Sequence, residues 1–267
     1  MFTAFTLVVG LAAILLIGVA VTISALFAIL VPVAIGLVGI ASLRQPLRQH
    51  RAYRSMYTPG YFKVEDTAEA HAIMRAQSFA ILVTQGVEGL TATHLPTILK
   101  VDGGAPLGRI ECHLARPNPQ WKTYAPDIDA LVIFQGPEAY IRPSWYPSKA
   151  EHGKVVPTWN YAAVHAYGRL EAVEDKAWLL AHVAELSDQQ EAPYAAPWSA
   201  ADAPANFLAT LIHGIVGLKL TIGRLEGKLK MSQNRTAADR EGVVRGLGQR
   251  ASGEDATIAS LVAKLAP

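Results

Sequence analysis

Short runs of alternating hydrophobic and polar residues dominate the chain from residue 56 onward, and this pattern predicts β-strands. Strands are expected at 79–84, 90–101, 107–114, 130–134, 139–141, 161–170 and 215–224. The segments 85–89, 102–106 and 136–137 between them hold the glycine, proline and acidic residues typical of turns. No strand–helix–strand alternation supports a doubly wound parallel sheet. The pattern therefore predicts a small antiparallel barrel.

Helical signals are fewer and lie between or after the strands. Asp66 and Thr236 each stand three residues before an acidic side chain, a capping pattern that predicts helices starting at these positions. Apolar spacing predicts a helix over 175–186, a short helical piece over 207–212 and a last short helix over 254–265. The predicted fold class is therefore mainly β with helical additions (α+β).

Two connecting segments differ from ordinary turns. Residues 187–204 are rich in proline and alanine and are expected to be a linker. Residues 142–159 are long, irregular and rich in proline, tryptophan and tyrosine. Loops of this length are usually functional or disordered, and the aromatic content argues against disorder.

The first 43 residues form an apolar run that carries no charged side chain. A membrane-spanning helix needs only about 20 such residues, so a two-helix hairpin and a single tilted span with an interfacial continuation both fit. A buried core hairpin fits poorly, because the run has no face for solvent. The sequence thus predicts a hydrophobic helical segment before the barrel, with the membrane as a possible partner.

Residues 44–55 are a basic linker, and their four arginines favour a cytoplasmic location for the domain that follows. A third interpretation is a misassigned gene start. Met56 begins a segment that resembles the natural start of a soluble domain, and translation from it would give a fully cytoplasmic protein. The expected domains are 1–43, 44–55, a barrel domain over 56–250, and a tail or short helix over 251–267.

Charge and composition narrow the function classes. All 22 acidic residues follow residue 55, so the domain after the arginines is slightly acidic although the whole chain has a net charge of +2. Nonspecific DNA binding needs a positive field, which this slightly acidic domain lacks. The remaining way for the domain to bind DNA is a local basic patch formed on dimerisation. The single cysteine excludes an intrachain disulfide, and no dinucleotide, P-loop or zinc-ligand spacing is present. No metal site is predicted, and no catalytic residue can be named.

Three segments, 92–96, 113–121 and 156–161, combine hydrogen-bonding groups with apolar or aromatic neighbours, as a flat and partly polar cofactor requires. Arg116 could clamp a phosphate, although an ordinary surface ion pair is the simpler interpretation. Trp121, Trp145 and Trp159 could stack on a ligand, although core or interface packing is more common for such residues.

Seven motifs in order carry a resemblance to a known family: MYTPGYF at 56–62, ATHLP at 92–96, HLARPNPQW at 113–121, VIFQGP at 132–137, YIRPSWY at 140–146, VPTWNY at 156–161 and KMSQNR at 230–235. From residue 56 to about 250 the chain resembles the PaiB-type FMN-binding negative transcriptional regulators. It departs from them at Lys230 and Met231, where an aromatic or leucine-rich lead is usual, and in having the apolar segment at 1–55.

The resemblance implies an FMN-binding split β-barrel and a homodimer with flavin at the subunit interface. By position, Thr93 and His94 would line the flavin ring, and Trp121 would contribute to the cofactor site. His113, Arg116 and Asn118 would face the phosphate and ribityl side. The partner subunit would close the site with Trp145, Trp159 and Asn160.

The resemblance also implies the function, a negative transcriptional regulator that binds FMN and has DNA as a partner. The alternative is a flavin-dependent oxidoreductase or reductase that acts on a small substrate, because the fold hosts such chemistry in relatives. A third hypothesis is a binding module of the same fold without flavin.

Overall fold

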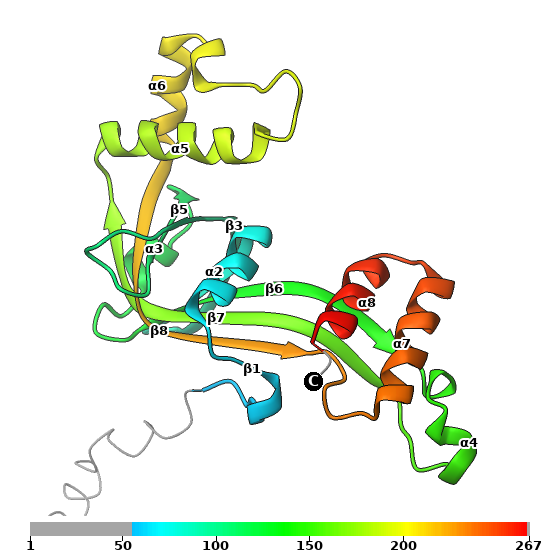
Figure 1. Ribbon diagram of the computed structural model, residues 1–267. Coiled ribbons are helices and arrows are strands. Elements are labelled where there is room, and N and C mark those ends of the chain that lie inside the picture. Colours follow the sequence, from blue (N-terminus) through cyan, green and yellow to red (C-terminus); the bar gives the residue numbers. More distant parts are fainter. Residues whose placement is uncertain (1–54, 266–267) are drawn as a thin grey trace, which may run out of the picture. The chain divides into compact units, whose positions relative to one another are not determined.

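An eight-stranded antiparallel sheet forms the centre of the computed structural model, which describes residues 55–265 (Figure 1). Along the sheet the strands follow the order β3-β2-β6-β7-β8-β5-β4, and β1 pairs with β8. The strands are β1 (Lys63–Val64), β2 (Phe79–Gly86), β3 (Gly89–Pro96), β4 (Ile98–Lys100), β5 (Arg109–Ala115), β6 (Ala130–Ile141), β7 (Thr158–Val173) and β8 (Ile215–Lys230). The sheet curls, so that residues of β3 lie within 8 Å of residues of β5. The prediction of a mainly antiparallel β structure with helical additions is confirmed.

The helices sit at the two ends of the long strands β6, β7 and β8 and across their middle (Figure 1). They are α2 (Thr67–Ala76), α3 (Gln120–Thr123), α4 (Ser148–His152), α5 (Lys176–Glu191), α6 (Ala205–His213), α7 (Ala237–Arg250) and α8 (Asp255–Lys264), with short 3-10 turns η2 (Gly60–Phe62), η3 (Pro143–Trp145) and η4 (Ala200–Asp202). Both predicted caps are present, since Asp66 accepts from the Ala68 amide and Thr236 from the Asp239 amide.

One predicted turn is wrong. Residues 136–137 do not separate two strands but form a bulge within β6, where the pairing with β7 shifts between Gln135 and Glu138. Gly136 lies so close to β7 that a Cβ atom there would come within 2.7 Å of the Ala162 Cβ. Proline cannot donate to the ladder and glycine allows this approach, so the same two residues that suggested a turn produce a bulge instead.

The predicted strand 90–101 is divided in two by Thr97. Its amide and its hydroxyl both bond to the Ser78 carbonyl, at 2.8 Å each, which takes the residue out of the ladder. The predicted linker at 187–204 begins as the last turn of α5, because that helix continues to Glu191.

The inner face of the curled sheet holds the core. Leu82, Val132 and Phe134 are almost fully buried there, and Ala70 and Met74 of α2 pack into the same cluster. The inner face is therefore closed by the chain itself.

The outer face of strands β3, β2, β6, β7 and β8 is only half buried. Strand register places two rows of residues across it: His94, Ile81, Ile133, His165 and Glu226, and then Ala92, Val83, Leu131, Tyr167 and Arg224. Each row has aliphatic residues on the central strands and polar or aromatic residues toward β8. None of the ten is buried.

Within residues 55–265 there is no helix long and apolar enough to span a membrane. The predicted apolar segment 1–43 and the arginines of the basic linker lie outside the described residues. The anchor, the hairpin and the alternative start at Met56 therefore stay predictions.

Candidate functional site

Thr93 and Asn118, two of the predicted site residues, meet in a hydrogen-bond network at the edge strand β3. Asn118 Nδ2 donates to Thr93 Oγ1 at 3.1 Å, and Thr93 Oγ1 donates to Gln120 Oε1 at 2.6 Å. The Gln120 backbone amide donates to Asn118 Oδ1 at 3.0 Å. The loop before α3 and the first residue of that helix thus bring Asn118 and Gln120 to one side chain of β3.

Gln120 is the buried centre of this network. Its side chain is fully shielded from solvent, and its Nε2 lies near the carbonyl oxygens of Leu82 and Thr91 and the Thr84 hydroxyl. Thr93 and Asn118 remain partly exposed. Because Gln120 is buried and bonded to all these partners, it holds the Thr93 and Asn118 side chains in fixed positions.

Arg116, in the loop before α3, and Trp121, in α3, lie close to this network. The Trp121 Nε1 donates to the Arg116 carbonyl at 3.0 Å, and Lys122 Nζ lies 4.6 Å from the centre of the Trp121 ring. The Arg116 guanidinium donates to the carbonyls of His213 and Ile215 and pairs with Glu174 at 2.6 Å. Its role toward a phosphate stays a prediction, and Lys122 is a second cation beside the same ring.

His94 and His113 lie apart from this network. His94 follows Thr93 in β3, so its side chain leaves the opposite face of the strand and lies near Phe79. His113 Nδ1 instead lies 3.2 Å from the buried His182 Nε2 of α5. Burial lowers the pKa of both imidazoles, and with the additional effect of His113 and Lys100 the pKa of His182 falls to about 4.

Asn160 and Trp159 belong to a second cluster at the far end of β7. The Asn160 amide exchanges hydrogen bonds with Ser232, which adopts a left-handed conformation with φ of 63°. Trp159 is half exposed and packs edge-on against Tyr140, and its carbonyl accepts from Lys230 Nζ at 2.6 Å. Desolvation and the nearby Lys228 and Arg235 lower the pKa of Lys230, in that order.

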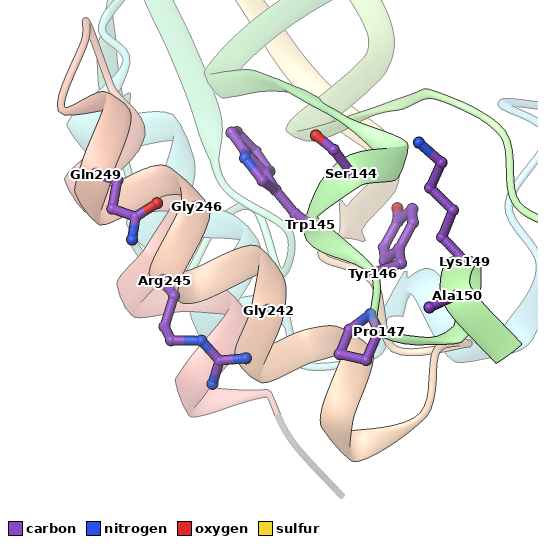
Figure 2. A pocket seen from close by; sticks show the side chains of 10 residues that line it. All are labelled: Ser144, Trp145, Tyr146, Pro147, Lys149, Ala150, Gly242, Arg245, Gly246 and Gln249. Atoms are coloured by element: carbon purple, nitrogen blue, oxygen red, sulfur yellow. The ribbon is translucent and has the colours of Figure 1, made fainter.

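Trp145 forms one wall of a cavity of about 590 Å³ between α7 and residues 144–150 (Figure 2). Gly242 and Gly246 of α7 face it, and a Cβ at Gly246 would lie only 2.3 Å from the indole ring. The Arg250 guanidinium covers the ring and also donates to the Tyr140 carbonyl, which links this cavity to the Trp159 cluster. Lys149 and Arg245 are the cations on its rim.

Seven of the nine predicted site residues therefore fall into two groups within one chain, and His94 and His113 belong to neither. One group lies beside β3 and consists of Thr93, Asn118, Trp121 and Arg116. The other lies near the start of β7 and the end of β6 and consists of Trp145, Trp159 and Asn160, where Arg250 contacts both Trp145 and Tyr140.

Gln120 lies in the segment 113–121 that was predicted to offer hydrogen-bonding groups, although no role at the cofactor was assigned to it, and Lys122 was not singled out. The spacing Asn-Pro-Gln, which lets Asn118 cap the amide of Gln120, is the signal that could have assigned Gln120 a positioning role.

Other candidate chemistry is limited in this region of the chain. Burial and the adjacent Glu111 raise the pKa of the Cys112 thiol to about 12, so this cysteine is a packing residue rather than a nucleophile. Among residues 55–265 no cluster of three or more His, Cys, Asp or Glu side chains is placed to hold a metal ion.

A family model described as "Putative FMN-binding domain" matches residues 56–224. The chain belongs to this FMN-binding family. A curated relative supports the assignment: the protease synthase and sporulation protein PAI 2 of Bacillus subtilis strain 168 is 36% identical over 192 residues, which cover 72% of this chain and 89% of the relative. The resemblance to the PaiB-type family is thereby confirmed, and FMN is the cofactor.

Two further similarities were found, one to a curated protein and one to a solved structure. The uncharacterized protein AN0679 of Emericella nidulans is 34% identical over 203 residues, covering 65% of this chain and 81% of its own length. Among solved structures, the conserved hypothetical protein Rv2991 of Mycobacterium tuberculosis gives a TM-score of 0.46 at 14% identity, with 66% of this chain and 91% of that chain covered.

The residues beside β3 fit the chemistry of FMN. Thr93 and Asn118 would offer ordered polar groups to a flavin, Trp121 an aromatic surface, and Lys122, with Arg116 beyond its ion pair to Glu174, positive charge to a phosphate. Bound FMN would supply reversible electron transfer at this place. The chain's own residues would orient the ring and neutralise the phosphate.

Proposed function

We propose that the protein is a negative transcriptional regulator of the PaiB type, a homodimeric split barrel with FMN at the subunit interface. In this proposal one subunit contributes the group around Thr93 and Asn118. The second subunit contributes Trp145, Trp159 and Asn160. The single observation that carries the proposal is the half-exposed aliphatic outer face of the sheet, which needs a cover.

The outer face has the composition of a protein–protein interface. Ile81, Val83, Leu131 and Ile133 form its aliphatic centre, and His165, Tyr167 and Glu226 lie toward its border. Stable interfaces combine such an apolar centre with a polar rim. A second copy of this chain would cover the centre, and it would bring the two groups of site residues from different subunits within reach of one flavin.

A local group of basic residues is consistent with the regulator. Residues 228–250 carry six basic and two acidic side chains, although Lys228 is buried, Arg250 pairs with Asp255 and Arg245 lies 3.7 Å from Glu241. Arg240 and Arg245 lie on α7, and Lys149 lies across the cavity on α4 (Figure 2). In a dimer two such lobes would present paired basic surfaces, which is the local patch that phosphate contacts require.

The experiment that tests the regulator is selection of sheared DNA from the source organism on the purified protein, followed by footprinting of the enriched fragments. We expect a protected site whose affinity falls as salt is raised, because phosphate contacts release counterions. Arg240→Gln with Arg245→Gln should weaken protection by about tenfold or more, whereas Lys264→Gln, on the exposed end of α8, should leave it unchanged. No enriched fragment, together with rapid reduction of bound flavin by a reduced nicotinamide dinucleotide, would favour the oxidoreductase instead.

The cytoplasmic location also belongs to this proposal. It is supported by the arginines that follow the apolar segment and by the single, buried cysteine.

A further inference from the structure

Backbone groups determine the direction of each hydrogen bond around Thr93, because a carbonyl oxygen can only accept and an amide N–H can only donate. Gln120 places one end of its amide between the carbonyl oxygens of Leu82 and Thr91, at 3.3 and 3.2 Å. Carbonyl oxygens only accept, so the end that faces them is the NH₂ group. The oxygen of the Gln120 side chain therefore faces Thr93.

As a consequence, the Thr93 hydroxyl must donate its proton to Gln120. Gln120 Oε1 lies 2.6 Å from Thr93 Oγ1 and can only accept, so the hydroxyl donates inward. The backbone amide of Gln120 can only donate, which makes the Asn118 atom 3.0 Å away its oxygen. The Asn118 NH₂ group then faces Thr93 at 3.1 Å.

Each exposed member of the network keeps one unused group. Thr93 Oγ1 donates its proton to Gln120 and accepts one bond from Asn118, which leaves one lone pair. Asn118 Nδ2 uses one hydrogen for Thr93 and keeps the other. Both side chains are partly exposed at the edge strand, so a ligand can reach an acceptor and a donor that lie side by side.

We propose that this acceptor–donor pair reads the pyrimidine edge of the flavin: Thr93 accepts from the ring N3–H, and Asn118 donates to a neighbouring ring carbonyl. Gln120 is the positioning residue that sets the polarity of the pair. The inference rests on the proposed location of FMN beside β3. It gives Asn118 a place at the ring rather than on the phosphate and ribityl side.

The test compares FMN with its N3-methyl derivative, which cannot donate at N3, by fluorescence titration of the full-length protein. We expect wild-type protein to bind N3-methyl-FMN about tenfold to a hundredfold more weakly than FMN, because a partly buried acceptor loses its partner. Thr93→Val should weaken FMN by a similar factor and cause little further loss with the methylated flavin. Thr221→Val, an exposed threonine of β8, is the matched control and should change neither affinity.

Additive losses from Thr93→Val and N3 methylation would overturn the inference while leaving the flavin site intact. Failure of the wild-type protein to bind either flavin would overturn the flavin site beside β3 as well. Gln120→Met tests the positioning role: the affinity ratio of FMN to N3-methyl-FMN should fall toward one in folded protein. An unchanged ratio would show that Gln120 does not set the polarity of Thr93.

A second variant keeps the test valid if Gln120→Met does not fold. Asn118→Asp replaces the donor by an acceptor on the exposed rim of the network, and it should weaken FMN and N3-methyl-FMN by about tenfold each at neutral pH. The loss should shrink as pH falls and the carboxyl becomes protonated. Unchanged FMN affinity in this variant would remove Asn118 from the ring edge.

Discussion

Single residues in this protein are tied to their positions mainly by backbone groups. Asn118 and Gln120 bond to each other and to β3, and Arg116 bonds to the carbonyls of His213 and Ile215. In the proposed site, such side chains would serve both the fold and the ligand. For Arg116 the two roles can be separated by experiment.

Arg116→Ala should weaken FMN binding by more than about tenfold if the guanidinium also contacts the phosphate, through loss of a charge-assisted pair. It should also lower the free energy of unfolding by about 1 kcal/mol, since two carbonyl contacts and the ion pair with Glu174 are lost. Titration with FMN and chemical denaturation measure the two effects. Arg169→Ala, an exposed arginine paired with Asp129, is the control. Reduced stability with unchanged FMN affinity would remove Arg116 from the cofactor site.

At the scale of elements, close approach to glycine positions the pieces around the site. The bulge at Gly136 lets β6 remain paired with β7 on both sides of the irregularity. Two glycines of α7 let η3 lie directly against that helix. The bulge explains why the two strands predicted at 130–134 and 139–141 form one strand, β6. Glycine and proline indicate an irregularity, but only the neighbouring strand decides whether it is a turn or a bulge.

Two glycines of α7 provide a matched pair. Gly246→Ala should destabilise the protein by about 1–3 kcal/mol, because the new Cβ would lie 2.3 Å from the Trp145 ring. Gly248→Ala, on the open side of the same helix with no atom within 4 Å, should stabilise it by about 1 kcal/mol through helix propensity. Thermal unfolding measures both. Equal stability of the two variants would show that α7 does not pack on Trp145.

At the scale of the whole molecule, the two faces of the sheet differ in burial. The inner face is closed by α2 and the chain's own core, whereas the outer face is left half exposed with an aliphatic centre. The dimer proposed above follows from this difference.

Ile133→Asp, in the middle of the outer face, should convert a dimer into monomers, because an unpaired charge would be buried between the copies. It should also weaken FMN binding, since the flavin would lose the residues of the second subunit. Sedimentation velocity and FMN titration measure these effects. Val87→Asp, in an almost fully exposed turn, should alter neither. A monomeric wild-type protein that still binds FMN fully would contradict an interfacial site.

The sequence by itself determined the mainly antiparallel fold class, most of the strands, the two helix caps and the family, but it joined β3 to β4, divided β6 and left α4 (Ser148–His152) inside a segment expected to be irregular. These depend on local patterns: alternation, capping spacing and ordered motifs are readable without knowing which segments meet. It also placed Asn118 and Thr93 among the candidates for the cofactor site.

Only the tertiary structure decided which candidates share a location and which way their hydrogen bonds run. Thr93 and Gln120 are 27 residues apart, and their contact depends on how α3 packs beside the edge of the sheet. The polarity of the Thr93 hydroxyl depends on the carbonyls of two different strands. Long-range contacts of this kind leave no local pattern in a single sequence. The acceptor–donor pair of Thr93 and Asn118 therefore follows only from the packing of the loop before α3 against β3.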